Sequence, residues 1–183
     1  MVASTLSWRR ERRLPAAALR SSGVVGAIGF VSLIGMFGAF AIGARSAGMT
    51  LGWMNDVTGV VTLPLAIPGL IVLHARLRPY GGRASDALLV VAIGATGAIA
   101  GLQLLLVTGV LPFEQQIGPV SAAYVAMIGY FILAGRMTAR AGVVPGGALL
   151  GLGAGLMAGY PIWAFRVARA IESTPVAMPE PAS

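Results

Sequence analysis

The segment that decides the fold of this chain is Gly147-Ala-Leu-Leu-Gly151-Leu-Gly-Ala-Gly155-Leu-Met-Ala-Gly159, within an apolar run from about residue 143 to residue 165. A helix has about 3.6 residues per turn, so glycines at every fourth position share one slowly drifting stripe. In a soluble helix each glycine would cost about 1 kcal/mol relative to alanine. Inside a bilayer the backbone groups must hydrogen-bond within the segment, which strongly favours a helix, and a glycine stripe lets a second helix approach closely. The segment therefore predicts a packing surface, a glycine zipper, in a membrane-embedded helical bundle.

The composition supports a membrane protein. Of the 183 residues, 57% are hydrophobic and 10% are charged, and the mean hydropathy is +0.85, far from the balance of a soluble domain. The chain has no cysteine and a single histidine, so we expect no disulfide, no metal site and no cofactor. The net charge is +7, and every basic side chain counted in it is an arginine. These arginines lie mostly beside apolar runs, which fits membrane topology better than nucleic-acid binding.

Five apolar segments are long enough to be membrane spans, because a spanning helix needs about 20 residues. The first is longer than the apolar region of a signal peptide, so we expect an uncleaved anchor. A basic cytoplasmic segment (residues 1–23) precedes a membrane domain (residues 24–168), and a flexible tail (residues 169–183) follows it. The predicted fold class is all-α, a polytopic transmembrane bundle with five spans at about 24–44, 57–73, 87–110, 119–135 and 143–165.

The arginines predict the orientation, because cytoplasmic loops of membrane proteins are enriched in lysine and arginine. With the N-terminus inside, the outer segments hold only Arg45, Arg166 and Arg169. Five spans then place the C-terminus outside. Arg166 and Arg169 are discordant, and they would fit if the last span ended early or its tail lay along the membrane surface. The inner segments hold all the other arginines: Arg9, Arg10, Arg12, Arg13, Arg20, Arg76, Arg78, Arg83, Arg136 and Arg140.

Small residues mark the expected helix contacts. The glycine stripe has three interpretations: packing within one chain, packing between identical chains, or a pore helix that slides during gating. The expected partners are the lipid bilayer and, through the last helix, a second copy or another membrane protein. Gln103, the one strongly polar side chain of its span, should hydrogen-bond to a neighbouring helix. The predicted packing glycines are Gly147, Gly151, Gly155 and Gly159 in the last span, and Gly97 and Gly101 in the third.

Polar residues at the ends of the spans are the candidate sites. On the outer side, Asp56 and Glu114 could act as a pair of catalytic carboxylates on a lipid or small apolar substrate. Alternatively, Asp56 caps a helix and Glu114 solvates a loop. On the inner side, basic side chains could bind lipid phosphate, or they could complement a helix C-terminus and extend to the interface. The candidates for the lipid headgroup are His74, Arg76, Arg78 and Arg136.

One segment resembles a known group of proteins: Gly135-Arg-Met-Thr-Ala-Arg140-Ala-Gly-Val-Val-Pro145-Gly-Gly-Ala-Leu-Leu-Gly151. Over residues 135–160 the chain is similar to small bacterial multipass membrane proteins of unknown function. The shared pattern is an arginine-containing turn, a proline and a glycine-rich final helix. The resemblance implies an integral bundle in a bacterial plasma or inner membrane, and it carries over no active-site residue.

The sequence contains no recognisable catalytic constellation. We therefore expect a structural or accessory membrane component that packs through its glycine-rich last helix. The alternatives are a membrane enzyme that acts on a lipid or isoprenoid substrate, and a small transporter or channel subunit.

Overall fold

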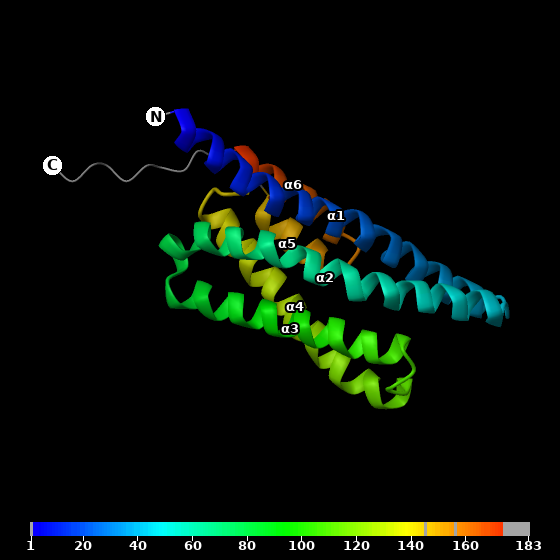
Figure 1. Cartoon of the computed structure of the whole chain (residues 1–183). Coiled ribbons are helices and arrows are strands. Elements are labelled where there is room, and N and C mark those ends of the chain that lie inside the picture. The colour runs from blue at the N-terminus through cyan, green and yellow to red at the C-terminus, as the bar shows by residue number, and fades with distance from the viewer. Residues whose placement is uncertain (1, 145, 156, 174–183) are drawn as a thin grey trace.

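The computed structural model describes residues 2–144, 146–155 and 157–173, with side chains from residue 13 onward, and these residues form helices without any strand (Figure 1). The helices are α1 (Val2–Ala41), α2 (Arg45–Gly81), α3 (Arg83–Val107), α4 (Phe113–Arg140), α5 (Gly147–Gly155) and α6 (Tyr160–Ser173). The predicted all-α class is confirmed. Residues 13–41 of α1, and α2, α3 and α4, are long and apolar enough to cross a membrane. Four such helices indicate a membrane-embedded helical bundle.

The segment expected to form a fifth span forms two short helices instead, so that prediction is wrong. Helix α5 has nine residues, which gives a length of about 14 Å, less than half of a bilayer core of about 30 Å. Between α5 and α6 the chain turns at Met157, whose φ is 62°. The turn depends on glycine, because a Cβ on Gly159 would lie 2.5 Å from the carbonyl carbon of Gly153.

Helices α5 and α6 form a hairpin that enters the bundle and returns to the end from which it came. Helix α5 lies against α4, and Tyr160, at the start of α6, meets Gly26 near the middle of α1. At the other end of α6, Glu172 forms an ion pair with Arg20. The last described residues therefore lie at the same end of the bundle as the N-terminal part of α1 and the turn between α2 and α3 (Figure 1).

The four long helices form two antiparallel hairpins, α1–α2 and α3–α4, which pack on each other through α2 and α3. At the end opposite the α2–α3 turn, the two hairpins diverge (Figure 1). Buried apolar side chains such as Leu19, Leu70, Ile99 and Trp163 form the core between the helices. Many large apolar side chains on the outside, such as Val90, are exposed, as expected for helices that face lipid.

The helix ends differ from the predicted boundaries at several points. Helix α2 begins at Arg45, and its helical pattern continues through Pro64 and Pro68, so Asp56 lies within a helix and does not cap one. The basic N-terminal segment is part of α1. Of the expected flexible tail, residues 169–173 belong to α6, and residues 174–183 lie outside the described part of the chain.

Candidate functional site

The glycine stripe of α5 is a contact surface with α4 in the same chain. A Cβ on Gly151 would lie 2.8 Å from the Cα of Gly135, and a Cβ on Gly147 would lie 2.9 Å from the carbonyl oxygen of Gly135. Because these neighbours are backbone atoms, the two helices touch main chain to main chain. Gly155 is less confined, since its nearest neighbour would be the Ile128 side chain at 3.3 Å. The faces of Gly147 and Gly151 are thus filled within one chain and are closed to another protein.

The other predicted packing glycines have different surroundings. The three atoms nearest to a Cβ on Gly159 all belong to Gly153, across the turn of its own hairpin. A Cβ on Gly97 or Gly101 would meet no described atom within 4 Å. The expected role of Gly97 and Gly101 as helix contacts is therefore not fulfilled inside the described chain, and both glycines face outward from α3.

The basic residues expected at a lipid headgroup are largely engaged with the protein itself. His74 places Nδ1 2.9 Å from the hydroxyl of Ser85 and Nε2 3.2 Å from the carboxylate of Asp86. Arg78 places Nε 3.3 Å from the same carboxylate. Asp86 lies in the first turn of α3, where a negative charge complements the helix dipole. These contacts join the end of α2 to the start of α3.

Arg76 joins α2 to the hairpin. Its guanidinium donates hydrogen bonds to the carbonyl oxygens of Ala170 (2.6 Å) and Ile171 (2.8 Å), near the end of α6. The last carbonyls of a helix lack partners within that helix, and a positive charge at this position is favourable. Arg136, the fourth candidate, is exposed on α4. The four side chains do not form one anion-binding pocket.

The two candidate carboxylates lie on different hairpins. Glu114 is exposed in the first turn of α4. Asp56 is half-buried on α2 and acts electrostatically on the hydroxyl of Tyr124. Tyr124 itself lies ten residues beyond Glu114, about 15 Å along the axis of α4. This arrangement gives no support to a catalytic site shared by Asp56 and Glu114.

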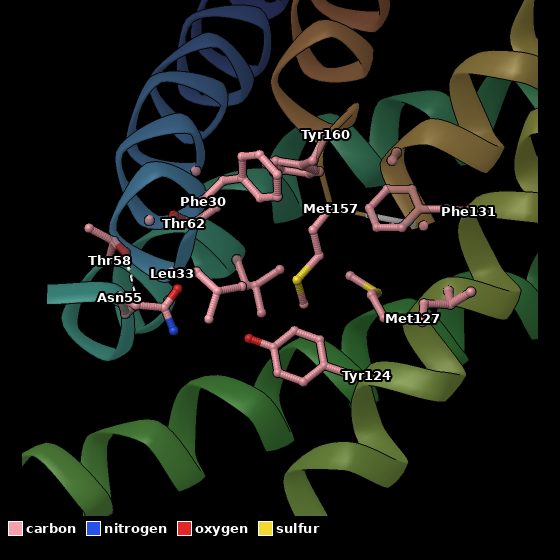
Figure 2. A pocket seen from close by; sticks show the side chains of 17 residues that line it. Phe30, Leu33, Asn55, Thr58, Thr62, Tyr124, Met127, Phe131, Met157 and Tyr160 are labelled. Carbon is pink, nitrogen blue, oxygen red and sulfur yellow. Dashed lines mark hydrogen bonds between the residues drawn. The ribbon is translucent and has the colours of Figure 1, made fainter. Parts of the chain in front are cut away.

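The structure contains a cavity of about 90 Å³ at the tip of the α5–α6 hairpin, between α1, α2 and α4 (Figure 2). Most of its wall is apolar or aromatic, and glycines of three helices bring the backbones close to it. The lining residues are Gly26, Gly29, Phe30 and Leu33 of α1, Asn55, Thr58, Gly59, Thr62 and Leu63 of α2, Tyr124, Met127, Ile128 and Phe131 of α4, and Ala154, Gly155, Met157 and Tyr160 of the hairpin.

A buried hydroxyl network fixes the hairpin on one side of this cavity. The Ser22 hydroxyl lies 2.6 Å from the carbonyl oxygen of Thr62 and is also hydrogen-bonded to the Tyr160 hydroxyl. A carbonyl only accepts, so Ser22 donates its one proton to Thr62 and Tyr160 donates to Ser22. The network joins α1, α2 and α6. Aromatic packing adds to it, because Phe131 of α4 lies edge-on to Trp163 of α6 with ring centroids 4.9 Å apart.

A second polar contact lies next to the cavity wall, at the lining residues Gly59 and Tyr124. Gln103 of α3 donates through Nε2 to the hydroxyl of Tyr124 on α4, at 3.3 Å, which confirms that Gln103 bonds to a neighbouring helix. The side chain fits over Gly59 of α2, where a Cβ would lie 2.7 Å from the Cδ of Gln103. The Oε1 atom of Gln103 and the Oγ1 atom of Thr62 are buried, and no described side chain or backbone group bonds to either.

The sequence did not predict this cavity. Gly26, Gly29 and Gly59 lie in runs that read simply as apolar spans, and Tyr160 was placed inside a fifth span. Gln103 is one signal in this region, because it predicts a polar contact between helices. Comparison of the chain with protein-family models, with curated proteins and with solved structures gives no match. The length and composition of the four apolar helices indicate a membrane-embedded helical bundle.

Proposed function

We propose that this protein is a structural or accessory component of a bacterial plasma membrane. Its N-terminus, its α2–α3 turn and the end of α6 face the cytoplasm. It associates with a second copy through α3. The orientation is supported by the arginines. Because α6 returns to the N-terminal end of the bundle, Arg166 and Arg169 join the arginine-rich end. Arg45, the first residue of α2, is then the sole arginine at the opposite end, the proposed outer side, which agrees with the positive-inside rule.

Single cysteines test this orientation, since the natural chain has none. Ser46 and Ser173 are exposed, near the start of α2 and at the end of α6 respectively. In intact cells a membrane-impermeant maleimide should label the Ser46→Cys variant and leave the Ser173→Cys variant unlabelled. After permeabilisation both should react. Labelling of the Ser173→Cys variant in intact cells would place the end of α6 outside and contradict the proposal.

The association rests on one observation, the open glycine face of α3. Gly94, Gly97 and Gly101 are spaced by three and four residues, so they share one side of the helix. A Cβ on any of the three would meet no described atom within 4 Å. Glycine in a membrane helix is favourable mainly where another helix approaches closely. The α5 stripe cannot take this role, because α4 fills it. The free face of α3 is therefore the surface that we assign to a second copy.

Leucine substitutions test the association. Gly97→Leu and Gly101→Leu should each weaken self-association in nanodiscs or liposomes by about tenfold or more, because a bulky side chain separates the backbones. Gly118→Leu on α4 is the matched control, since Gly118 is also exposed with no described atom within 4 Å. Energy transfer between labelled copies measures the association. A monomeric wild type, or equal behaviour of all three variants, would refute packing through α3.

A further inference from the structure

The cavity at the hairpin tip lies at the point where the two long hairpins begin to diverge. Gly29 and Thr58 line it on the α1–α2 side and Tyr124 on the α3–α4 side. The hairpin tip, at Met157, closes it toward the arginine-rich end. Beyond the cavity, α1–α2 and α3–α4 separate toward the outer end (Figure 1). A molecule in the cavity thus has a closed floor beneath it and diverging helices above it.

The two ends of the cavity differ in chemistry, as Figure 2 shows. Phe30, Phe131 and Tyr160 lie toward one end, and the thioethers of Met127 and Met157 lie in the middle. Methionine sulfur makes favourable contacts with aromatic rings and adapts its shape to an occupant. This part of the wall favours a small flat ring over a branched or charged group.

The other end carries hydrogen-bond donors. The Tyr124 hydroxyl points toward the side-chain amide of Asn55 (Figure 2). Because the Tyr124 oxygen already accepts a proton from Gln103, its own proton is free to be donated. The amide of Asn55 donates one N–H to the carboxylate of Asp56, and its second N–H remains as a further donor. Two donors directed at one place suit an oxygen atom of a ligand.

The volume limits the occupant. A dry cavity of about 150 Å³ holds benzene, and one water occupies about 30 Å³ of the liquid. A cavity of about 90 Å³ therefore accepts a single six-membered ring only if a side chain shifts. Met157 can do so, because its side chain is flexible and lies at the turn between two helices. Fused rings and large headgroups do not fit.

From this arrangement we infer that the cavity binds a single ring that bears an oxygen acceptor, of the phenol or quinone type, with the oxygen at Asn55 and Tyr124 and the ring among Phe30, Met127 and Met157. A ring that carries an apolar tail directs the tail between the two diverging hairpins. The site does not depend on the proposed self-association, because no lining residue belongs to α3.

Binding of 4-fluorophenol, observed by fluorine NMR with the protein in nanodiscs, tests this inference. The matched probe is 4-fluorotoluene, which has the same ring and lacks the oxygen, and empty nanodiscs correct for partitioning into lipid. We expect 4-fluorophenol to bind about fivefold to tenfold more tightly than 4-fluorotoluene, the effect of one hydrogen bond. Equal binding of the two probes would overturn the recognition of oxygen.

Variants separate recognition from loss of the fold. Tyr124→Phe should reduce the preference for 4-fluorophenol, because one of the two donors is lost, and should leave binding of 4-fluorotoluene unaffected. Tyr80→Phe, at an exposed tyrosine, should change the binding of neither probe. Leu33→Trp should fill the cavity and abolish binding of both probes while the thermal unfolding temperature stays near that of the wild type. Undiminished binding to the Leu33→Trp variant, or an equal loss of both probes in Tyr124→Phe, would refute the site.

A third arm distinguishes the two sources of such a ring. If the natural occupant is the head of a membrane lipid, 4-octylphenol should compete for the site far better than phenol at equal concentration in the bilayer. If the occupant is a free small molecule, the two should compete equally. Failure of both to displace 4-fluorophenol would contradict the inference.

Discussion

The contact between α5 and α4 predicts a sharp difference between neighbouring glycines. In Gly151→Ala the new Cβ would lie 2.8 Å from the Cα of Gly135, whereas carbon atoms in contact are normally about 3.5–4.0 Å apart. The atoms that the new Cβ meets, the Cα of Gly135 and the carbonyl oxygen of Phe131, belong to the backbone of α4, so no side chain can move aside and α5 must shift by about 1 Å. Overpacking of this kind costs about 1–3 kcal/mol.

Gly153→Ala is the control for this prediction. It lies on the same helix, and its Cβ would meet its nearest neighbour, the Cα of Gly159, at an ordinary distance of 3.5 Å. Both variants replace glycine by alanine within α5, so any gain in helix propensity is shared. The difference between their free energies of unfolding therefore measures the α4–α5 contact. Gly155→Ala should fall between them, because its neighbour is the Ile128 side chain, which can give way.

The assay is unfolding of the purified protein in mixed micelles titrated with a denaturing detergent, followed by circular dichroism. We expect Gly151→Ala to be less stable than Gly153→Ala by about 1–3 kcal/mol. The same order should appear in thermal unfolding. Equal stabilities would show that the glycine stripe does not face α4, and the hairpin arrangement would then be wrong.

Two further predictions concern the polar contacts. Arg76→Gln should speed hydrogen exchange at the end of α6 and lower the free energy of unfolding by about 1.5–3 kcal/mol, because it removes charge-assisted hydrogen bonds to carbonyl groups. The control Arg78→Gln, at an exposed side chain, should lower it by less than about 1 kcal/mol, and equal effects of the two variants would contradict a capping role for Arg76. A double-mutant cycle between Gln103→Leu and Tyr124→Phe should measure a coupling energy of about 1 kcal/mol. Gly59→Ala should displace Gln103 and abolish this coupling. An unchanged coupling would show that Gly59 does not hold the pair in place.

Much of the class and the helix inventory could be predicted from local properties of the chain. Four spans were identified because apolar length and the absence of charge belong to each segment by itself. Their ends were less accurate: α2 extends twelve residues ahead of the expected start at residue 57, to Arg45. Nothing local marks that end, since Thr50 and Trp53 are as compatible with an interfacial loop as with a helix.

The candidate site was predicted less well. The sequence predicts that His74 and Arg78 bind a lipid headgroup or complement a helix end, whereas the structure pairs both with Asp86. Asp56 and Glu114 were paired because both precede expected spans, but they belong to hairpins that diverge. A cavity is the space that remains after side chains from several helices have packed, so its position depends on contacts that no single segment contains.

The sequence by itself determined that the chain is helical, that its helices are apolar enough for a membrane, and that ten of its thirteen arginines lie in segments predicted to share one side. These properties follow from hydrophobicity and charge, which add up residue by residue. Only the tertiary structure showed that the apolar run at residues 143–165 contributes to two short helices, α5 and α6, because a run of that length suits one span and a helical hairpin equally well. The choice rests on partners far away in the chain: Gly135 receives the glycines of α5, and Ser22 and Gly26 receive Tyr160. The same contacts return Arg166 and Arg169 to the arginine-rich end and leave the cavity at the tip of the hairpin.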